Sequence, residues 1–542
     1  MKIDHAEKKL HRGHRLHALV VAVPLTLLAT CANAAYNVAI STNATSNMTL
    51  SGGVYSATGN SAVLNITDLK NALSSGNVTV NNGTGGSQNG DITVASKLAW
   101  PAHRLTLDAY HSVVVKAVVK ARGTSGLTIT TNDGGTAGDL LINAGRIVFQ
   151  NTSQSLTING TAYTLVPDIA TLATDISGNI HGNFALMDNY DASLGVTYTT
   201  SPMTAFYDGT FEGLGNTISN FKLLVTTKIF EVALFSYSEG AIRDLTMSNE
   251  LITNNQDNFD LGGLVGTNYG LIENVTTGGD MQIAPGRYAG GLVGTNQGHI
   301  VNCRSSISIE GDVHTNQGGL VGYHINGSIS GSSASGPMSN PNLEVQVGGL
   351  VGFGGGGTID TSFATGNVTT KGYAGGLVGA NGFQGINGGA ISKSYATGDV
   401  TGNYDVGGLV GHNQSAISNS YSTGSATGAS GANVGGFIGV DQNPGGATAS
   451  YSTGTVATGT HVGGFIGLDS FSGSISNAYW DTTTSGITSL SQGAGSPAND
   501  PGITGQTTSQ LQSGLPTGFS STIWAESSTI NGGLPYLKDN TP

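Results

Sequence analysis

A five-residue word, Gly-Gly-[Leu/Phe]-[Val/Ile]-Gly, recurs along this chain and constrains its fold more than any other feature. Successive second glycines of the word are 28, 28, 30, 27, 32, 28 and 28 residues apart. The copies occupy residues 262–266, 290–294, 318–322, 348–352, 375–379, 407–411, 435–439 and 463–467. Self-similarity at a nearly constant period of this length indicates a stacked repeat architecture.

Each repeat also contains a second strand-like word after a short turn. It reads Ile-Ser-Lys-Ser-Tyr-Ala-Thr-Gly at 391–398 and Ile-Ser-Asn-Ser-Tyr-Ser-Thr-Gly at 417–424. Two or three short strands per unit, with no helical period, are typical of one coil of a β-helix. A single coil cannot bury its apolar side alone, so the coils must stack. The sequence therefore predicts an all-β fold, a right-handed parallel β-helix (β-solenoid).

Glycine and asparagine are expected at the coil corners. Glycine permits positive φ and lets adjacent coils approach closely. Asparagine and aspartate tolerate left-handed φ, bond their own backbone and can form ladders along a stack. Such a residue follows the first word in most repeats, at Asn268, Asn296, Asn381, Asn413, Asp441 and Asp469.

The chain divides into five predicted segments. Residues 1–34 resemble a secretory signal peptide, because a basic start precedes an apolar run and Ala32-Asn33-Ala34 supplies small residues before a cleavage site. Alternating apolar runs at 35–165 predict irregular β-helix coils, and 166–260 is interpreted as a transition with a degenerate repeat. The eight regular repeats fill 261–484. Residues 485–542 are expected to form a linker and a cap on the open end of the stack.

Composition excludes several classes of function. Beyond residue 34, 15 lysines and arginines face 31 aspartates and glutamates, a balance that opposes nucleic-acid binding. Cys303 is the only cysteine beyond that point, so no disulfide can form within one chain. We expect Cys303 to be a buried thiol. No catalytic residue, cofactor or metal site is assigned, because no nucleophile–base pair or ligand spacing recurs.

The paired words resemble the GLUG motif of large bacterial surface and secreted proteins, which include filamentous-haemagglutinin-like adhesins and some streptococcal immunoglobulin-A-protease proteins. The runs Leu-Thr-Leu at 105–107, Leu-Thr-Ile-Thr at 127–130 and Leu-Thr-Ile at 156–158 are similar to haemagglutinin-type stretches. The resemblance implies a surface or secreted adhesin. Two departures matter: Asn-Pro-Asn-Leu, which marks the secretion domain of such adhesins, occurs only at 340–343, and no His-Glu-x-x-His protease motif is present.

One repeat position holds an aromatic column. Its preceding position carries small residues, which an interior requires, so strand alternation directs the aromatic side chains outward. The small residues are Val275, Cys303, Ser332, Ser362, Ser394, Ser420, Ser450 and Ala478. The aromatic column is a candidate ligand-contact stripe, although a stacked ladder that only stabilises the sheet would have the same pattern. It consists of Phe363, Tyr395, Tyr421, Tyr451 and Tyr479.

These observations favour an exported bacterial adhesin that is secreted or held at the cell surface, associated with the outer membrane, after signal-peptide cleavage. The expected partners are host cell-surface glycans or matrix, or other bacterial cells, with an outer-membrane transporter for export. One alternative is a structural surface or biofilm protein without a specific ligand. The other is a polysaccharide-active β-helix enzyme, since isolated acids such as Asp360 and Asp399 could pair across coils.

Overall fold

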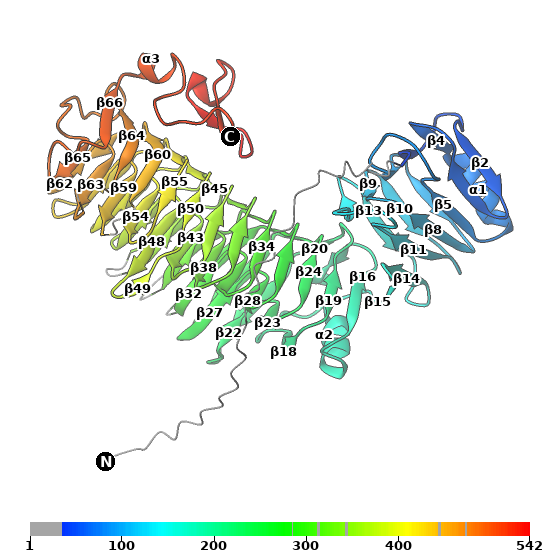
Figure 1. Ribbon diagram of the computed structural model, residues 1–542. Coiled ribbons are helices and arrows are strands. Elements are labelled where there is room, and N and C mark those ends of the chain that lie inside the picture. Colours follow the sequence, from blue (N-terminus) through cyan, green and yellow to red (C-terminus); the bar gives the residue numbers. More distant parts are fainter. Residues whose placement is uncertain (1–34, 285, 312–314, 342–344, 443–445, 472–473) are drawn as a thin grey trace, which may run out of the picture.

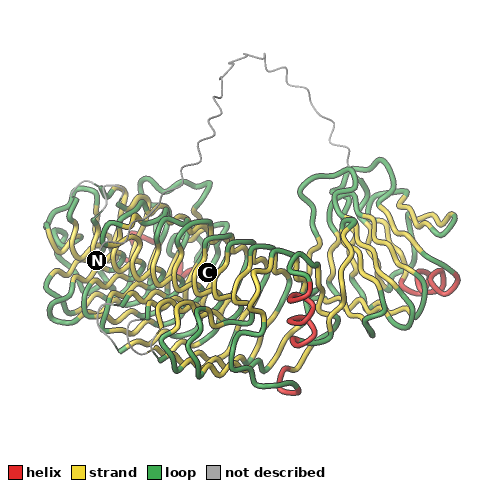
Figure 2. Tube along the Cα trace, turned by 90° about the horizontal axis from the view of Figure 1, so that it is seen from below, coloured by secondary structure: helices red, strands yellow, loops and turns green. Residues whose placement is uncertain are grey.

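The computed structural model describes residues 35–284, 286–311, 315–341, 345–442, 446–471 and 474–542 (Figure 1). These residues form a parallel β-solenoid of about 16 turns with few helices, which confirms the predicted fold class. The proposed signal peptide, 1–34, lies outside the described residues. Figure 2 shows two consecutive stacks of coils, with a helix at the outer end of the first and another where the stacks meet.

The first stack comprises residues 35–158 and has three faces of parallel strands. Helix α1 (Ile66–Ser75) packs on it through Leu69 and Leu73, which are fully buried. Its first face runs β4 (Ala62–Asn65), β1 (Val38–Ser41), β6 (Ile92–Val94), β9 (Val113–Val115), β12 (Leu140–Ile142). Its second runs β7 (Leu98–Trp100), β10 (Val118–Ala121), β13 (Arg146–Phe149). Its third runs β3 (Val54–Ala57), β5 (Val78–Asn81), β8 (Arg104–Asp108), β11 (Gly126–Thr130), β14 (Ser155–Ile158), and β2 (Met48–Ser51) pairs antiparallel with β3.

An antiparallel pair joins the first stack to the second, which comprises residues 161–506. Strand β15 (Thr161–Val166) turns back on β14 and then pairs in parallel with β16 (Asn183–Leu186). Between them lies α2 (Ile169–Gly178), whose N-cap carboxylate of Asp168 accepts a hydrogen bond from the Thr171 N–H. Apolar side chains of α2 join the core of the second stack, so this helix covers its first coil. The helix lies within the segment 166–260 that the sequence indicates to be a transition.

A regular coil of the second stack contains five strands. One complete coil consists of β32 (Gly286–Gly290), β33 (Val293–Asn296), β34 (His299–Val301), β35 (Arg304–Ser305) and β36 (Ser308–Gly311). Each strand pairs in parallel with its equivalent one coil along. The face that includes β33 already begins at β18 (Met203–Tyr207), and β19 (Thr210–Glu212) continues from β16, both ahead of the first word; the stack runs on to β65 (Ala494–Ser496) and β66 (Ile503–Gln506).

The glycine word forms the corner between the strands equivalent to β32 and β33. A Cβ on Gly290 would lie 2.0 Å from the Val293 carbonyl oxygen, and one on Gly291 would lie 2.3 Å from the Gly319 carbonyl oxygen of the next coil. Neither glycine has positive φ. The expectation that these glycines supply left-handed corners is therefore wrong; they are required because backbone packs on backbone where a side chain would stand.

The left-handed position lies at another corner, within the second word. It directly precedes the buried residue of the small column, or Leu245 in the first of these coils, and its φ ranges from 44° to 58°. The residues are Asp244, Asn274, Asn302, Gly331, Thr361, Lys393, Asn419, Ala449 and Asn477. Asparagine is common there because it tolerates this conformation better than other side chains do.

We predict that Gly322→Ala destabilises the protein by about 1–3 kcal/mol or more, because the new Cβ would stand 2.5 Å from the Ala289 amide nitrogen. Gly431→Ala is the matched control, since a Cβ there meets no atom within 4 Å and its φ is not positive. Urea unfolding of both variants checks this. Equal midpoints for the two variants would contradict the close-packing role of the corner.

Candidate functional site

The predicted aromatic stripe is a stacked ladder on the outside of the second stack. The ring centroids of Phe363 and Tyr395 are 4.8 Å apart with planes 2° from parallel, and those of Tyr395 and Tyr421 are 4.8 Å apart at 8°. Tyr421 and Tyr451 follow at 5.1 Å and 2°, and Tyr479 pairs in register with Tyr451. The rings belong to a cluster separate from the solenoid core, as strand alternation requires.

This ladder is covered, however, by the C-terminal segment, residues 507–542. The segment contains α3 (Thr508–Leu511), β67 (Trp524–Ala525) and β68 (Tyr536–Leu537) and lies alongside the stack (Figure 1). The Trp524 ring lies 6.1 Å from Tyr421 and 6.0 Å from Tyr451, and its indole N–H donates to Asn419 Oδ1 at 3.2 Å. The Tyr451 hydroxyl donates to the Pro535 carbonyl oxygen at 2.7 Å.

The covering segment changes two expectations. Tyr395, Tyr421, Tyr451 and Tyr479 are at most 5% exposed, so the stripe does not present an open binding face, and only Phe363 is half-buried. Residues 507–542 also lie on the side of the coils, reaching back to Ser362 through Asn540 Nδ2. Only the earlier part of the predicted linker and cap, which adds β65 and β66 to the last coil, lies at the open end. The physical reason that 507–542 lie on the side is the apolar surface of the ladder itself, which Phe519, Trp524 and Leu537 bury. Burial also raises the pKa of Tyr395 to about 12.

We predict that Trp524→Ala loosens the C-terminal segment, at a cost of about 3–5 kcal/mol in segment docking. Hydrogen exchange in 507–542 and binding of a hydrophobic dye should both increase, because the tyrosine ladder becomes accessible. Leu490→Ala, at a side chain 70% exposed, is the control and should change neither reading. Unchanged hydrogen exchange in Trp524→Ala would contradict the conclusion that Trp524 holds the C-terminal segment on the tyrosine ladder.

The small column beside the ladder lies inside and is a chain of serine hydrogen bonds. The Ser362 hydroxyl accepts the Ser332 N–H of the preceding coil at 3.2 Å and donates to the Asp360 carbonyl oxygen of its own coil at 2.8 Å. Equivalent bonds link the later serines, and all of them are fully buried. Cys303 occupies the same column, and burial raises the pKa of its thiol to about 12, so it is not a thiolate nucleophile near neutral pH.

The asparagine column forms a second buried ladder. Asn268 Nδ2 donates to Asn296 Oδ1 at 2.8 Å, and Asn413 Nδ2 donates to Asp441 Oδ1 at 2.8 Å. Each also bonds the backbone of its own turn, as Asn268 does to Gly270. None of these residues has positive φ, so the left-handed part of the expectation is wrong while the ladder part is confirmed.

A further row of aromatic residues, which the sequence interpretation missed, follows the glycine corner on the outside. Outward side chains of the two strands that meet there contact each other: the rings of Tyr323 and Tyr288 have centroids 4.6 Å apart with planes tilted by 35°, and Tyr323 stacks on Phe353 at 5.1 Å. We call this set the corner row. It consists of three groups of contacting rings, Phe206 with Tyr237, Tyr288 with Tyr323 and Phe353, and Tyr373 with Phe383, and Thr267 and Thr295 stand in register between the first two groups. Phe206 is 48% exposed, and all the other rings except Phe353 are half-buried.

Polar groups alternate with the rings of the corner row. Asp260 accepts hydrogen bonds from the hydroxyls of Thr267 and Thr295, each at 2.8 Å. The exposed guanidinium of Arg287 lies 5.4 Å from the Tyr288 ring centroid, within the range of a cation–π contact. His412 Nδ1 lies 2.8 Å from Asp405 Oδ2 beneath Phe383. Asp260 and Arg287 therefore place polar groups beside partly exposed rings, whereas Asp405 and His412 are buried.

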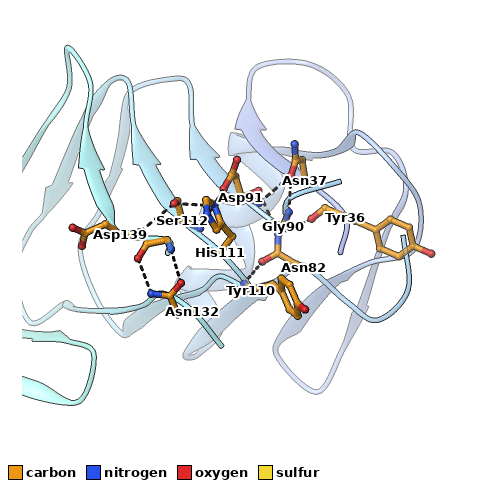
Figure 3. A network of polar contacts seen from close by, with 11 residues as sticks. Tyr36, Asn37, Asn82, Gly90, Asp91, Tyr110, His111, Ser112, Asn132 and Asp139 are labelled. Atoms are coloured by element: carbon orange, nitrogen blue, oxygen red, sulfur yellow. Dashed lines mark hydrogen bonds and ion pairs between the residues drawn. The ribbon is translucent and has the colours of Figure 1, made fainter. Parts of the chain in front are cut away.

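In the first stack, Ser112, His111 and Asp91 lie together like a hydrolytic triad (Figure 3). Both contacts of the histidine fall on the same nitrogen, Nδ1, which lies 2.7 Å from Asp91 Oδ1 and 3.0 Å from Ser112 Oγ. A proton relay needs the two partners on different ring nitrogens. Ser112 is also 2% exposed and its Oγ accepts the Asp139 N–H, so this network links coils.

Acidic residues gather around a cavity of about 180 Å³ where the two stacks meet, here called the junction cavity. Glu212, Arg243 and Glu273 stand in register on β19, β24 (Ala241–Arg243) and β29 (Leu271–Glu273). Asp139 from the first stack and Asp244 complete the charged lining. Burial, and next the charge of Asp244, raise the pKa of Glu212 to about 8; burial also raises that of Asp244 to about 7, although a hydrogen bond from Asn274 opposes it.

We predict that Glu212→Gln flattens the pH dependence of stability. A carboxyl whose pKa is raised by folding stabilises the folded state fully below its ordinary value of 4.5, and this contribution is lost as the pH rises toward about 8, by at most about 1.4 kcal/mol per pH unit. The glutamine variant should therefore be more stable than wild type at pH 8 and similar at pH 4.5. Thermal unfolding between these values measures the difference, and parallel pH profiles would argue against a strained Glu212.

No candidate metal centre, formed by three or more His, Cys, Asp or Glu side chains, occurs in the described residues. No described helix is both long and apolar enough to cross a membrane.

Comparison with known proteins identifies the GLUG motif at residues 402–427. No curated protein matches the chain. Among solved structures, an "IgA1 Protease" is similar at 19% identity and a TM-score of 0.36, covering 50% of this chain and 23% of its own, so the chain spans under a quarter of that protein. A putative immunoglobulin A1 protease from Bacteroides ovatus is similar at 16% identity and a TM-score of 0.36, covering 70% of this chain and 93% of its own.

Proposed function

We propose that this protein is an exported adhesin of the filamentous-haemagglutinin-like kind, which binds glycans on host or neighbouring cells through the corner row. The observation that carries the proposal is the partial exposure of this row, while the other aromatic ladder is buried. Aromatic rings with a polar edge supply large contact area at low entropic cost and are enriched at binding surfaces. The row lies along the coils, so an extended ligand could contact several of them.

Charge narrows the ligand class. The excess of 31 acidic over 15 basic side chains beyond residue 34 repels polyanions, so neutral glycans fit better than sulfated or uronic ones. Carboxylates such as Asp260 can accept ligand hydroxyls beside the rings. No catalytic step is assigned to this row.

Export is supported by the signal-peptide pattern at 1–34. The proposal places the mature protein outside the cell, either released or held at the outer membrane, with an outer-membrane transporter as its export partner. Host matrix and other bacterial cells are the alternative surfaces for the same row.

We predict that purified protein binds neutral glycans on an array and binds intact cells. Tyr323→Ser should weaken this binding about tenfold, because it removes the ring that contacts both Tyr288 and Phe353. Phe471→Ser, at a side chain 44% exposed outside the row, is the matched control and should bind like wild type.

Two results would count against an adhesin. If the wild-type protein binds neither the array nor cells, the alternative of a structural surface or biofilm protein without a specific ligand gains support. If binding persists equally in Tyr323→Ser, the ligand uses another face of the solenoid.

A further inference from the structure

The junction cavity has an unbalanced set of charges. Four carboxyl groups, of Asp139, Glu212, Asp244 and Glu273, line it together with one guanidinium, that of Arg243. The guanidinium is held only at long range, since its Nη1 lies 3.7 Å from Asp139 Oδ2 and its Nε lies 3.5 Å from Glu273 Oε2. Four carboxyl groups around one guanidinium make the cavity wall acidic, and its negative charge grows above neutral pH, where Glu212 and Asp244 lose their protons.

Glu212 gives a second and independent observation. Its side chain is 5% exposed and lines the cavity, yet its Oε2 has no hydrogen-bond partner among the described residues. A buried carboxyl oxygen without a donor is costly, and such groups normally have partners. Asp244, by contrast, accepts a hydrogen bond from Asn274 Nδ2 at 3.2 Å. Arg243 Nε, which also lines the cavity, has no hydrogen-bond partner among the described residues and lies 3.5 Å from Glu273 Oε2, so it does not satisfy Glu212. Glu212 Oε2 is therefore left without a donor, which a cationic ligand in the cavity would supply.

The shape of the carboxyl set favours an organic cation over a metal ion. The described residues contain no group of three or more acidic, histidine or cysteine side chains placed to hold a metal. The carboxyls are instead spread around a cavity of about 180 Å³ that also has apolar walls, from Leu140 and Ile158, and the Tyr163 ring. A cationic group on a short carbon chain or ring fits such a cavity, because the cation can bond the carboxylates while the carbon atoms contact the apolar walls.

We propose that the junction cavity binds a primary ammonium group, as carried by an amino sugar or a lysine side chain. The ammonium donates to Glu212 and to the neighbouring carboxyls, while its carbon atoms contact Leu140, Ile158 and Tyr163. This site uses none of the residues of the corner row and goes beyond the glycan binding proposed for it.

Binding should be coupled to proton release. The groups that face Glu212 are Asp139 from the first stack, Tyr163 on β15, Arg243 on β24, Asp244 after it and Glu273 on β29. Because the raised pKa values of Glu212 and Asp244 keep protons on the cluster near neutral pH, an arriving cation must displace them. Affinity should therefore rise between pH 5 and pH 8.

Isothermal titration of the purified protein with butylamine tests the proposal. We expect binding at pH 8 with net proton release, seen as a dependence of the heat on the buffer, and affinity at least about tenfold weaker at pH 5. Butanol, which has the same carbon chain without the charge, should not bind. Glucosamine and N-acetylglucosamine distinguish the sources: tighter binding of glucosamine than of butylamine indicates an amino sugar, and equal binding indicates the ammonium group alone.

Variants make the test specific. Glu212→Gln should weaken butylamine binding about tenfold, because a charge-assisted hydrogen bond is lost. Asp139→Asn offers a second variant at a more exposed position, in case the first disturbs folding. Glu310→Gln, on the exposed side of β36, is the control and should bind like wild type.

Absence of butylamine binding at pH 8, equal binding by Glu212→Gln and Asp139→Asn relative to wild type, or calcium binding that excludes butylamine would each overturn the proposal. Tyr323→Ser should leave butylamine binding intact, so failure of this site is distinguishable from failure of the corner row.

Discussion

The regular coils of the second stack depend on continuous hydrogen bonding from coil to coil through the glycine corner. At this corner the N–H groups of Leu292 and Val293 both donate to the Leu320 carbonyl oxygen of the next coil, at 2.9 and 3.0 Å. The same pattern repeats from Leu264 through Phe437. A parallel ladder usually stops where the chain turns, and here it continues because glycine lets the two backbones approach. This fixed corner sets the register in which the equivalent strands of successive coils pair.

Polar side chains complete the ladder where backbone pairing ends. Buried serines bond the N–H of the preceding coil, and buried asparagines bond each other and the turn that follows them. Burial of so many polar groups is tolerated because each finds a partner at the next coil. Such ladders add specificity, since a coil inserted in the wrong register would leave them unpaired.

The repeat predicted the fold because eight evenly spaced words allow few alternatives, and alternation placed the tyrosine ladder outside the core. Three features could not be predicted, each because residues distant in sequence meet in space. Nothing in Trp524 or Phe519 indicated that the C-terminal segment would cover the ladder, since this segment has no repeat register. The corner row escaped notice because Tyr288 and Tyr323 occupy different strands and meet only through the corner. The junction cavity joins Asp139 to Glu273, from two stacks.

The tyrosine ladder is buried and the corner row is partly exposed, and this difference indicates which of the two could bind a ligand. Tyr395, Tyr421 and Tyr451 would form a contiguous apolar stripe if bare, and 36 residues at the C-terminus are used to cover most of it. The corner row has no such cover in the described residues, although Phe206 and Tyr323 would gain from burial in the same way. Large apolar patches on soluble proteins are usually hidden unless they bind something. The C-terminal segment covers the tyrosine ladder, but no described segment covers the corner row. This difference favours the corner row as the binding surface.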